Sequence, residues 1–446
     1  MTKDKLPGED RLTIFGRELI DENSIAQIRN CYGAEDYAVL TADAHYGYGH
    51  PIGGAVAYRN QISLSGVGFD IACGNKAVRT DARAADIVAA DVMDEIFRRV
   101  SFGVGRVNNE PVDHPVVEKI RNAEYRPQAS MWQMAQNQLG TVGSGNHFVD
   151  LFEDEDGFLW IGVHFGSRGF GHKTTTGFIA MSQGLKFGDK ATEGPMDAPP
   201  ILFDKDSLIG QSYIEAMSLA GEYAYAGRDM VVAKVLEILG NPSVTYGVHN
   251  HHNFAWKEIH YGEEYWVVRK GCTPAFPGQA GFIGATMADI SVIVEGVDSD
   301  LSKTGLYSTV HGAGRVMSRT AAAGKKKYRK AWRCNNHYHC QGSLPIQTPM
   351  GIDGSNPKCP ACGMKMHKEQ WQEIIKPGSV DFKAVRENVA LKGVELRGAG
   401  ADEAPECYKR LDDVLAAQGE TIRVLHRLRP IGVAMAGVEV FDPYKD

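Results

Sequence analysis

The sequence has no long run of apolar residues. Nothing in the 446 residues approaches the roughly 18 consecutive apolar residues that a membrane-spanning helix needs. The segment from Met1 to Arg11 is charged and lacks the apolar stretch of a secretory signal. Positive charge is also scarce, because 48 lysines and arginines stand against 55 acidic residues and give a net charge of −7. We therefore expect a soluble, cytoplasmic protein without membrane contact, in which any surface that binds a polyanion is local.

Cysteine is sparse and unevenly distributed. The chain has eight cysteines, and four of them lie between residues 334 and 362. Disulfide frameworks are typical of small secreted domains, whereas a cysteine cluster in a long chain without a secretory signal is more typical of a metal site or of reactive thiols. This distribution favours a reducing compartment.

Glycine, in contrast, is abundant: the chain has 50, which exceeds the usual share of about 7%. Glycine permits positive φ angles and close approach of the backbone to a ligand. Single glycine strings are often ordinary turns, but here five strings also carry reactive side chains, which favours a ligand site. They are Gly47 to Gly54, Gly66 to Gly74, Gly140 to Gly145, Gly162 to Gly171, and Gly312 with Gly314.

The secondary-structure signals are mixed and predict an α+β fold. Helical spacing of apolar residues predicts one helix around Val92 to Val100 and a long helix over 211–239, which Gly240 and Pro242 would end. Short apolar runs predict buried strands, and three of them lead into histidines or a lysine. These runs are Tyr37 to Leu40, Phe158 to Val163, Val244 to Val248 and Tyr265 to Val268.

A set of histidines, one cysteine and one aspartate indicates a metal site. Asp70 and Cys73 lie three positions apart in a loop bounded by Gly68 and Gly74, so that both can face one point. A small buried cysteine on its own is more often structural. Four further strings that contain glycine or asparagine carry His147, His164, His251 with His252, and His311. Imidazole combined with thiolate and carboxylate suits Mn, Fe, Co or Zn better than Mg or Ca.

These strings resemble the RtcB family of RNA-splicing ligases, in order and along nearly the whole chain. The most specific is His-Gly-Ala-Gly-Arg-Val-Met-Ser-Arg, from His311 to Arg319. The others are Asp43-Ala44-His45, Gly47-Tyr48-Gly49, Pro51 to Gly54, Asp70 to Gly74, Asn146-His147-Phe148, His164 with Gly166 to Gly169, His252-Asn253, and Arg269-Lys270-Gly271.

The resemblance implies roles for individual residues. Asp70, Cys73 and His147 would hold one Mn²⁺, while Cys73, His164 and His252 would hold a second, with Cys73 as the bridge. His311 would be the catalytic residue, attacking the α-phosphorus of GTP to form a guanylylated histidine. The positions that match nucleotide contacts are Asn146, His147, Phe148, Asp150, His252, Asn253, Gly284, Ala285, Thr286, Met287, Ser291, His311, Gly312, Ala313, Gly314, Tyr408 and Ala436.

The implied reaction is RNA repair or splicing. The GMP moiety would pass to an RNA 3′-phosphate, and the 5′-hydroxyl of a second RNA end would then displace GMP. A 2′,3′-cyclic phosphate would first be opened. Arg168 and Arg315 are candidate phosphate clamps, although arginines beside glycine turns are as often ordinary surface residues. The resemblance leaves open the physiological RNA, the oligomeric state and an accessory activator.

Three departures from the family pattern lie around the nucleotide positions. Ala436-Gly437 stands where the family has Lys-Gly, and its lysine contacts the guanine nucleotide. Gly284-Ala285-Thr286-Met287 replaces Pro-Gly-Ser-Met, and Asp150 replaces glutamate. The implied metal ligands and His311 are all retained, so we expect a divergent member with retained chemistry.

Residues 325–375 differ in kind from the rest and are interpreted as an insertion between catalytic segments 1–324 and 376–446. The segment opens with the basic run Lys325 to Lys330 and then becomes rich in cysteine and histidine. We expect a zinc-ribbon-like site for one structural Zn²⁺ formed by Cys334, Cys340, Cys359 and Cys362. His337 or His339 could replace Cys334 as a ligand, and His367 is also near. The basic run with its aromatic residues suits RNA, and a merely solvated charge run is the alternative.

Two other functions compete with ligation. A protein that binds damaged RNA ends without joining them would explain Ala436, and would bind RNA ends in a way that does not respond to GTP. A metal-dependent phosphatase or cyclic phosphodiesterase would process ends without joining them, but would not need the His311 string. By resemblance, the fold is a single α+β catalytic domain with layered sheets and peripheral helices, interrupted by the insertion.

Overall fold

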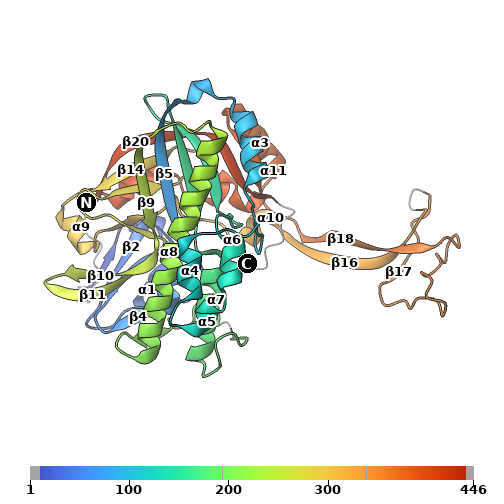
Figure 1. Cartoon of the computed structure of the whole chain (residues 1–446), viewed down its shortest axis with the longest axis horizontal. Helices are drawn as coiled ribbons and strands as arrows, with labels where there is room; N and C mark the ends of the chain where they lie inside the picture. The colour runs from blue at the N-terminus through green and yellow to red at the C-terminus, as the bar shows by residue number, and fades with distance from the viewer. Residues whose placement is uncertain (1–10, 193, 337–338, 438–446) are drawn as a thin grey trace.

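The computed structural model describes residues 11–192, 194–336 and 339–437. It is a mixed fold of two large sheets flanked by helices, from which one long β-hairpin projects (Figure 1). Among the described residues, no helix has the length and apolar character that crossing a membrane requires.

The first large sheet has five strands in the order β1-β2-β3-β11-β10. β1 pairs with β2 in parallel and the other pairs are antiparallel. β2 and β3 are buried almost throughout, which fits the apolar sequence of β3 and of the first part of β2, whereas Thr41 and Asp43 are buried polar residues of β2. The strands are β1 (Leu12–Ile14), β2 (Tyr37–His45), β3 (Ile52–Tyr58), β11 (Glu263–Lys270) and β10 (Asn253–His260).

The second large sheet follows the order β13-β14-β20-β6-β7-β5-β9, with β19 pairing beside β20. Its two edges approach each other, because Asn250 on β9 donates to the carbonyl of Ala280 on β13 at 3.2 Å, so the sheet is nearly closed into a barrel. The strands are β13 (Ala280–Ile283), β14 (Ser291–Gly296), β20 (Ile422–Gly437), β6 (Phe148–Glu153), β7 (Phe158–Phe165), β5 (Gly74–Arg83), β9 (Val244–His251) and β19 (Glu395–Ala399).

The two sheets share an apolar layer. Val39, Ala55 and Val267 of the first sheet belong to the same buried cluster as Val292 and Val294 of the second. Two short sheets lie beside them, formed by β12 (Cys272–Pro274) with β15 (Ser308–Val310), and by β4 (Gln61–Ser63) with β8 (Leu202–Asp204). This packing fixes the strand ends of both sheets relative to each other.

Helices cover the outer faces. The longest, α8 (Leu208–Ile238), runs along the front of the molecule in Figure 1 and begins at Ser207, whose hydroxyl accepts from the Gly210 amide at 3.1 Å. The others are α1 (Glu22–Arg29), α2 (Leu64–Val67), α3 (Ala89–Arg99), α4 (Pro115–Arg121), α5 (Arg126–Ala129), α6 (Trp132–Gln138), α7 (Arg168–Ser182), α9 (Asp300–Thr304), α10 (Arg319–Ala323), α11 (Phe382–Leu391) and α12 (Leu411–Gln418).

The predicted elements are confirmed with shifted ends. The helix predicted around Val92 to Val100 is α3, and the one predicted over 211–239 is α8, which begins earlier because Ser207 caps it. The four predicted strands lie within β2, β7, β9 and β11, and each of these is longer than predicted. The extensions carry polar residues such as Asp43, which apolar patterning alone does not include in a strand.

The projecting hairpin is formed by β16 (Lys325–Cys334) and β18 (Met366–Lys376), with the short β17 (Ser343–Pro345) beside β16. We call residues 325–376 the arm. Figure 1 shows β16 and β18 leaving the body together next to α10 and extending away from it. β16 begins at the residue where the sequence predicts the insertion to begin.

Candidate functional site

The site lies where strand ends from both large sheets meet. Its central loop connects α2 to β5 and contains Asp70 and Cys73. Ala72 has a positive φ of 60°, an uncommon conformation for a residue with a side chain, and its amide donates to the Asn253 carbonyl at 2.7 Å. The Cys73 carbonyl accepts from the His252 amide at 2.8 Å. The loop is therefore held directly against the strand ends that carry the histidines.

Two donor groups converge on Cys73. Its sulfur lies 3.6 Å from His147 Nε2 and 3.7 Å from His164 Nε2, and His147 Nε2 lies 3.0 Å from Asp70 Oδ2. The ligand atoms of Asp70, Cys73 and His147 lie within 4.8 Å of one another, and so do those of Cys73, His164 and His252. These are the two sets that the resemblance implied, with Cys73 common to both.

Hydrogen bonds set the orientation of the imidazoles. His164 Nδ1 lies 2.6 Å from Asn75 Oδ1, and the Asn75 amide group donates to the Phe282 carbonyl at 2.8 Å. Because the asparagine oxygen can only accept, His164 carries its proton on Nδ1 and turns an unprotonated Nε2 toward Cys73. His147 Nδ1 and His252 Nδ1 are buried and have no hydrogen-bond partner in the described parts of the chain.

The electrostatics of this cluster suit a cation. Burial, reinforced by the Asp70 carboxylate, raises the pKa of the Cys73 thiol well above its ordinary value. Burial lowers the pKa of the His164 and His252 imidazoles, so both rings are neutral. Burial opposes ionisation of Asp70, but the hydrogen bond and charge of His147 lower the pKa of that carboxyl to about 2. A thiol, three imidazoles and a carboxylate fit Mn, Fe, Co or Zn, and binding would release the thiol proton.

His311 follows β15 and is held by Asp43. Its Nδ1 lies 2.7 Å from Asp43 Oδ2, which also accepts from the backbone amides of His311 at 3.0 Å and Gly312 at 3.3 Å. The His311 ring centroid is 4.8 Å from that of His252. Because Asp43 binds Nδ1, the nitrogen left for chemistry is Nε2, in a ring that adjoins a metal-ligand candidate.

One cavity joins these groups. The predicted nucleotide-contact residues that line it are Asn146, His147, Phe148, Asp150, His252, Asn253, Gly284, Ala285, Thr286, Met287, His311, Gly312, Ala313, Gly314 and Tyr408. Ser291 does not line it, but its hydroxyl accepts from the Ala285 amide at 2.9 Å and so supports the lining segment. Asp150 Oδ1 is buried and has no hydrogen-bond partner among the described residues.

Ala436 lies outside the cavity. Side chains alternate along β20, and Val433 and Met435 line the cavity, whereas Ala434 and Ala436 pack into the apolar cluster behind the sheet. The sequence placed Ala436 among the nucleotide contacts, and the structure puts Met435 in the wall instead. An alanine at 436 therefore leaves no gap in the cavity lining.

The comparisons with known proteins agree with this arrangement. A sequence model of the family described as tRNA-splicing ligase RtcB matches residues 24–134 and 117–341. The chain belongs to the RtcB family. It is 31% identical over 482 residues to a tRNA-splicing ligase RtcB of Pyrobaculum aerophilum, covering 90% of this chain and 88% of the relative. It is 28% identical over 423 residues to the RNA-splicing ligase RtcB of Escherichia coli K12, covering 89% of each. A tRNA-splicing ligase RtcB of Archaeoglobus fulgidus is 27% identical over 501 residues.

The cavity of this RtcB-family chain also contains Lys270, a candidate from its place after a predicted strand, and two residues, Arg319 and Glu403, for which no role was predicted. Lys270 is buried, and its ammonium donates to the carbonyls of Tyr48 at 2.8 Å and His50 at 3.2 Å. Burial lowers the pKa of Lys270 to about 8. Arg319 and Glu403 also line the cavity and pair at 3.2 Å. Sequence position is the signal that indicates two of these residues, because Lys270 is the last residue of a strand and Arg319 is the last residue of the string that begins at His311.

The two candidate phosphate clamps differ in placement. Arg315 lines the cavity and donates to the Tyr408 hydroxyl at 2.8 Å and to the Asp402 carbonyl at 2.7 Å. Arg168 is not part of the lining, and its guanidinium donates to the Gly103 carbonyl at 3.0 Å. Only Arg315 is therefore placed to meet a ligand in the cavity.

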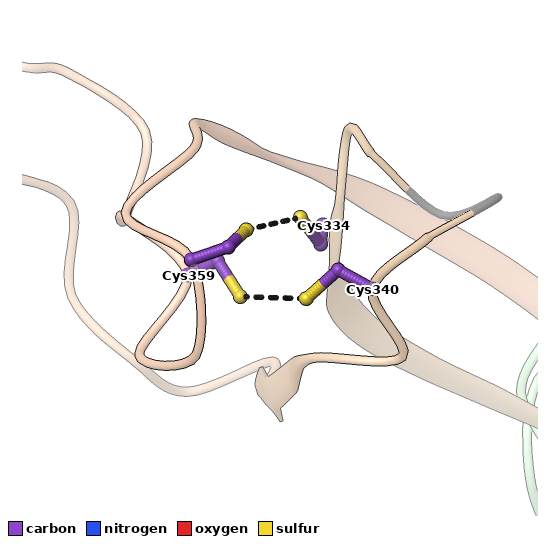
Figure 2. Close-up of side chains that lie close together, drawn as sticks. Cys334, Cys340 and Cys359 are labelled. Atoms are coloured by element: carbon purple, nitrogen blue, oxygen red, sulfur yellow. Dashed lines mark hydrogen bonds between the residues drawn. The ribbon is translucent and has the colours of Figure 1, made fainter.

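The arm carries a second donor cluster at its tip. The sulfurs of Cys334 and Cys362 lie 3.3 Å apart, those of Cys340 and Cys359 lie 3.6 Å apart, and all four are within 4.8 Å of one another (Figure 2). Although burial acts to raise it, backbone N–H groups of Ala361 and Cys362 lower the pKa of the Cys359 thiol to about 7.

Of the histidine alternatives at the tip, His339 and His367 do not join these sulfurs. His339 is exposed, His367 Nδ1 is 2.8 Å from Asn335 Oδ1, and His337 lies outside the described residues. Four thiols around one point are the donor set of a tetrahedral structural zinc site.

Proposed function

We propose that this protein is a GTP-dependent RNA ligase that joins an RNA 3′-phosphate or 2′,3′-cyclic phosphate to a 5′-hydroxyl. The observation that carries the proposal is the position of His311, which Asp43 orients and whose ring adjoins His252 of the metal-ligand cluster in one cavity. Membership of a family whose named relatives are RNA-splicing or tRNA-splicing ligases supports the same reaction.

In the first step, His311 Nε2 attacks the α-phosphorus of GTP. A nitrogen–phosphorus bond forms, and the bond to the β-phosphate oxygen breaks to release pyrophosphate. Asp43 holds the Nδ1 proton, so the neutral ring presents its lone pair at Nε2. Burial alone would raise the pKa of Asp43, but the neighbouring His311 and the hydrogen bonds from its ring, its backbone amide and Thr41 keep that pKa below its ordinary value. An ionised Asp43 stabilises the positive charge that the ring gains.

The second and third steps use the activated phosphate. A 3′-phosphate oxygen of RNA attacks the phosphorus on His311, which frees the imidazole and leaves an RNA–GMP anhydride. The 5′-hydroxyl of the second RNA end then attacks the 3′-phosphorus, losing its proton, and GMP leaves. A 2′,3′-cyclic phosphate must first add water across one P–O bond to give the 3′-phosphate. Arg315 lines the cavity, where it is paired with Glu403 and Tyr408, and we assign it to bind phosphate oxygens during these steps in exchange for part of those contacts.

The metal-ligand residues fit two divalent cations. We assign Asp70, Cys73 and His147 to one Mn²⁺ and Cys73, His164 and His252 to the other, because the donor atoms of each set converge on one point. When bound, such ions neutralise phosphate charge near the reacting phosphorus. We also assign one structural Zn²⁺ to the four arm cysteines, and we propose that residues 1–324 and 376–446 form the catalytic domain around an insertion at 325–375.

The buried wall of the cavity suits guanine. Asp150 Oδ1 has no partner in the described chain, and guanine offers N–H donors to such an acceptor. The Arg315–Tyr408 pair lines the same cavity.

The test is covalent labelling. The pure protein is incubated with Mn²⁺ and α-labelled GTP beside His311→Ala, Cys73→Ala and, as a matched control, His426→Ala, a partly exposed histidine bonded to Glu155. Label is expected on the wild type and the control and on neither of the other variants. RNA with a 3′-phosphate, but not with a 3′-hydroxyl, should then remove the label and be joined. Absence of label with every nucleotide and metal tested would overturn the proposal and favour an RNA-end-binding protein; end processing without label would favour a phosphatase.

A further inference from the structure

The arm differs from the rest of the chain in charge. Residues 325–376 contain ten lysines and arginines and three acidic residues, a net charge of +7. Because the whole chain carries −7, the remainder carries −14. Even if four thiolates around a Zn²⁺ ion add −2 at the tip, the arm remains strongly positive.

In the described part of the chain, acidic side chains pair with the arginines on one face of the hairpin but not with the lysines on the other face. Arg329 pairs with Glu373 at 2.5 Å and Arg333 with Glu369 at 3.0 Å. The β16–β18 register puts Lys330 opposite Gln370 and Trp332 opposite Lys368, on the other face of the hairpin. Lys330 and Lys368 are exposed, and neither is paired with an acidic residue of the described chain.

The tip adds two like charges in direct opposition. Lys358 and Lys365 form an isolated antiparallel bridge, and both are exposed. Like charges directly opposite each other on paired backbone are destabilising, unless an anion lies between or beside them. The arm therefore has cations along one face and at its end. Among the described residues, Lys330 and Lys368 form no ion pair, whereas Lys365 has the exposed Asp353 as an acidic neighbour.

The root of the arm is continuous with the cavity wall. Arg319 lines the cavity and is the first residue of α10, and β16 begins directly after the glycine that ends this helix. The chain returning from β18 is bonded to the same helix, because the Ser379 amide donates to the Ala321 carbonyl at 3.0 Å. A strand of ten residues spans roughly 30 Å. The arm, which leaves the body next to α10 and extends well away from it in Figure 1, thus carries its lysines and arginines outward from a helix whose first residue lines the cavity.

We propose that the arm binds the sugar-phosphate backbone of the RNA whose end lies in the cavity. The proposal rests on the proposed function, because it takes RNA to be the substrate. The contacts are to phosphates, so the arm contributes affinity and position rather than sequence preference. The four-cysteine cluster, by holding Zn²⁺, keeps the lysine-bearing tip folded.

The test uses the full-length, metal-loaded protein. The arm variant is Lys330→Glu/Lys365→Glu/Lys368→Glu. The matched control is Arg59→Glu/Lys257→Glu/Lys303→Glu, which makes the same change of charge on exposed cations at the β10 and α9 end of the molecule, opposite the arm. Affinity for a 3′-phosphorylated RNA is measured over a range of salt concentrations, together with zinc content, His311 labelling by GTP and joining kinetics.

The arm variant is expected to bind RNA at least about tenfold more weakly than the control. The slope of log K against log salt concentration should also become shallower, by roughly 0.7 to 0.9 for each of the about one to three phosphate contacts that are lost. Its KM for RNA should rise while kcat and His311 labelling are unchanged, and it should retain its zinc.

Equal RNA affinity of the two variants would overturn the inference about the arm. If the protein is still labelled by GTP and still joins RNA in that case, the proposed function stands. Competition by polyglutamate as effective as that by RNA would also overturn it, in favour of an acidic protein partner. If the wild type neither labels nor binds RNA, both proposals fall.

Discussion

Asp43 Oδ2 lies 2.7 Å from His311 Nδ1, although the two residues are 268 positions apart in the sequence. The carboxylate is fully buried and also accepts two backbone amides at the start of the His311 loop. Thr41 donates to its other oxygen at 2.6 Å. One side chain on β2 therefore fixes the ring orientation, the tautomer and the loop backbone of the proposed nucleophile.

Replacing Asp43 with asparagine should show whether Asp43 acts by orienting the His311 ring, independently of metal binding. The amide keeps the size of the side chain but removes the charge that stabilises the imidazolium and can favour the wrong tautomer. We expect the rate of His311 guanylylation to fall by roughly 10² to 10⁴-fold, the scale of such losses in other histidine–aspartate pairs. The measurement is single-turnover labelling, with bound metal determined in parallel. Unchanged labelling would contradict the role of Asp43, and lost metal would indicate a structural effect instead.

Arg228 is predicted to position the metal ligands from behind. This fully buried arginine of α8 donates to the carbonyls of Ala72 at 3.0 Å and Phe165 at 2.6 Å, next to Cys73 and His164. Its other nitrogens contact His249 at 3.0 Å and His251 at 2.9 Å. Arg228→Met leaves these groups without their donor, and we expect roughly 10 to 100-fold weaker metal binding.

The matched control for this prediction is Lys234→Met on the same helix, since the hydrogen bond that Lys234 makes within the described residues is a long one, 3.4 Å to the Gly140 carbonyl. Metal affinity is measured by titration and stability by thermal unfolding. Arg228→Lys should restore little of the lost metal affinity, because a single ammonium group cannot reproduce the planar set of donors of a guanidinium. Metal affinity of Arg228→Met equal to that of the control would show that α8 does not organise the centre.

The sequence indicated the candidate metal ligands, but not the residues whose hydrogen bonds orient the site. Cys73 and His164 lie in glycine- or asparagine-bounded strings, whose composition is a local signal. Asn75, Arg228 and the role of Asp43 depend on contacts between distant segments, and Arg228 has the sequence context of an ordinary helix residue. The contact of Ala436 with the nucleotide stays a prediction from the resemblance, and the sequence match does not include the side-chain direction on this strand, which turns Met435 toward the cavity. Patterning predicted the elements of the fold, whereas the near closure of the second sheet required the pairing of its strands.

Gly166 is predicted to be essential for one of the two metal positions. A methyl group there would lie 2.2 Å from Asp70 Oδ1, so the carboxylate would have to leave its position beside His147. Gly247 on β9 provides the control, since a methyl group there meets only Val78 at 3.6 Å and Ala77 at 3.8 Å. We expect Gly166→Ala to bind about one metal ion per chain where the wild type and Gly247→Ala bind two. Two equivalents bound to Gly166→Ala would argue against Asp70 as a ligand.

Asp150 is predicted to determine nucleotide preference. Its Oδ1 is buried without a partner in the described chain, and burial raises the pKa of this carboxyl well above its ordinary value. If guanine N–H groups bind it as a carboxylate, Asp150→Asn replaces one acceptor with a donor that faces other donors. We then expect selectivity for GTP over ATP in His311 labelling to fall by at least about tenfold, because a buried polar group left unpaired is costly.

Asp150→Glu keeps the carboxylate and serves as the rescue, since the resemblance puts glutamate at this position in the family. Labelling with each nucleotide is measured at subsaturating concentration, so that the ratio reports kcat/KM. An asparagine variant that keeps full GTP selectivity would instead mean that Asp150 acts as a neutral acid, because an amide offers the same single acceptor beside a donor. The two outcomes therefore distinguish the protonation state of Asp150 in the nucleotide complex as well as its contribution to specificity.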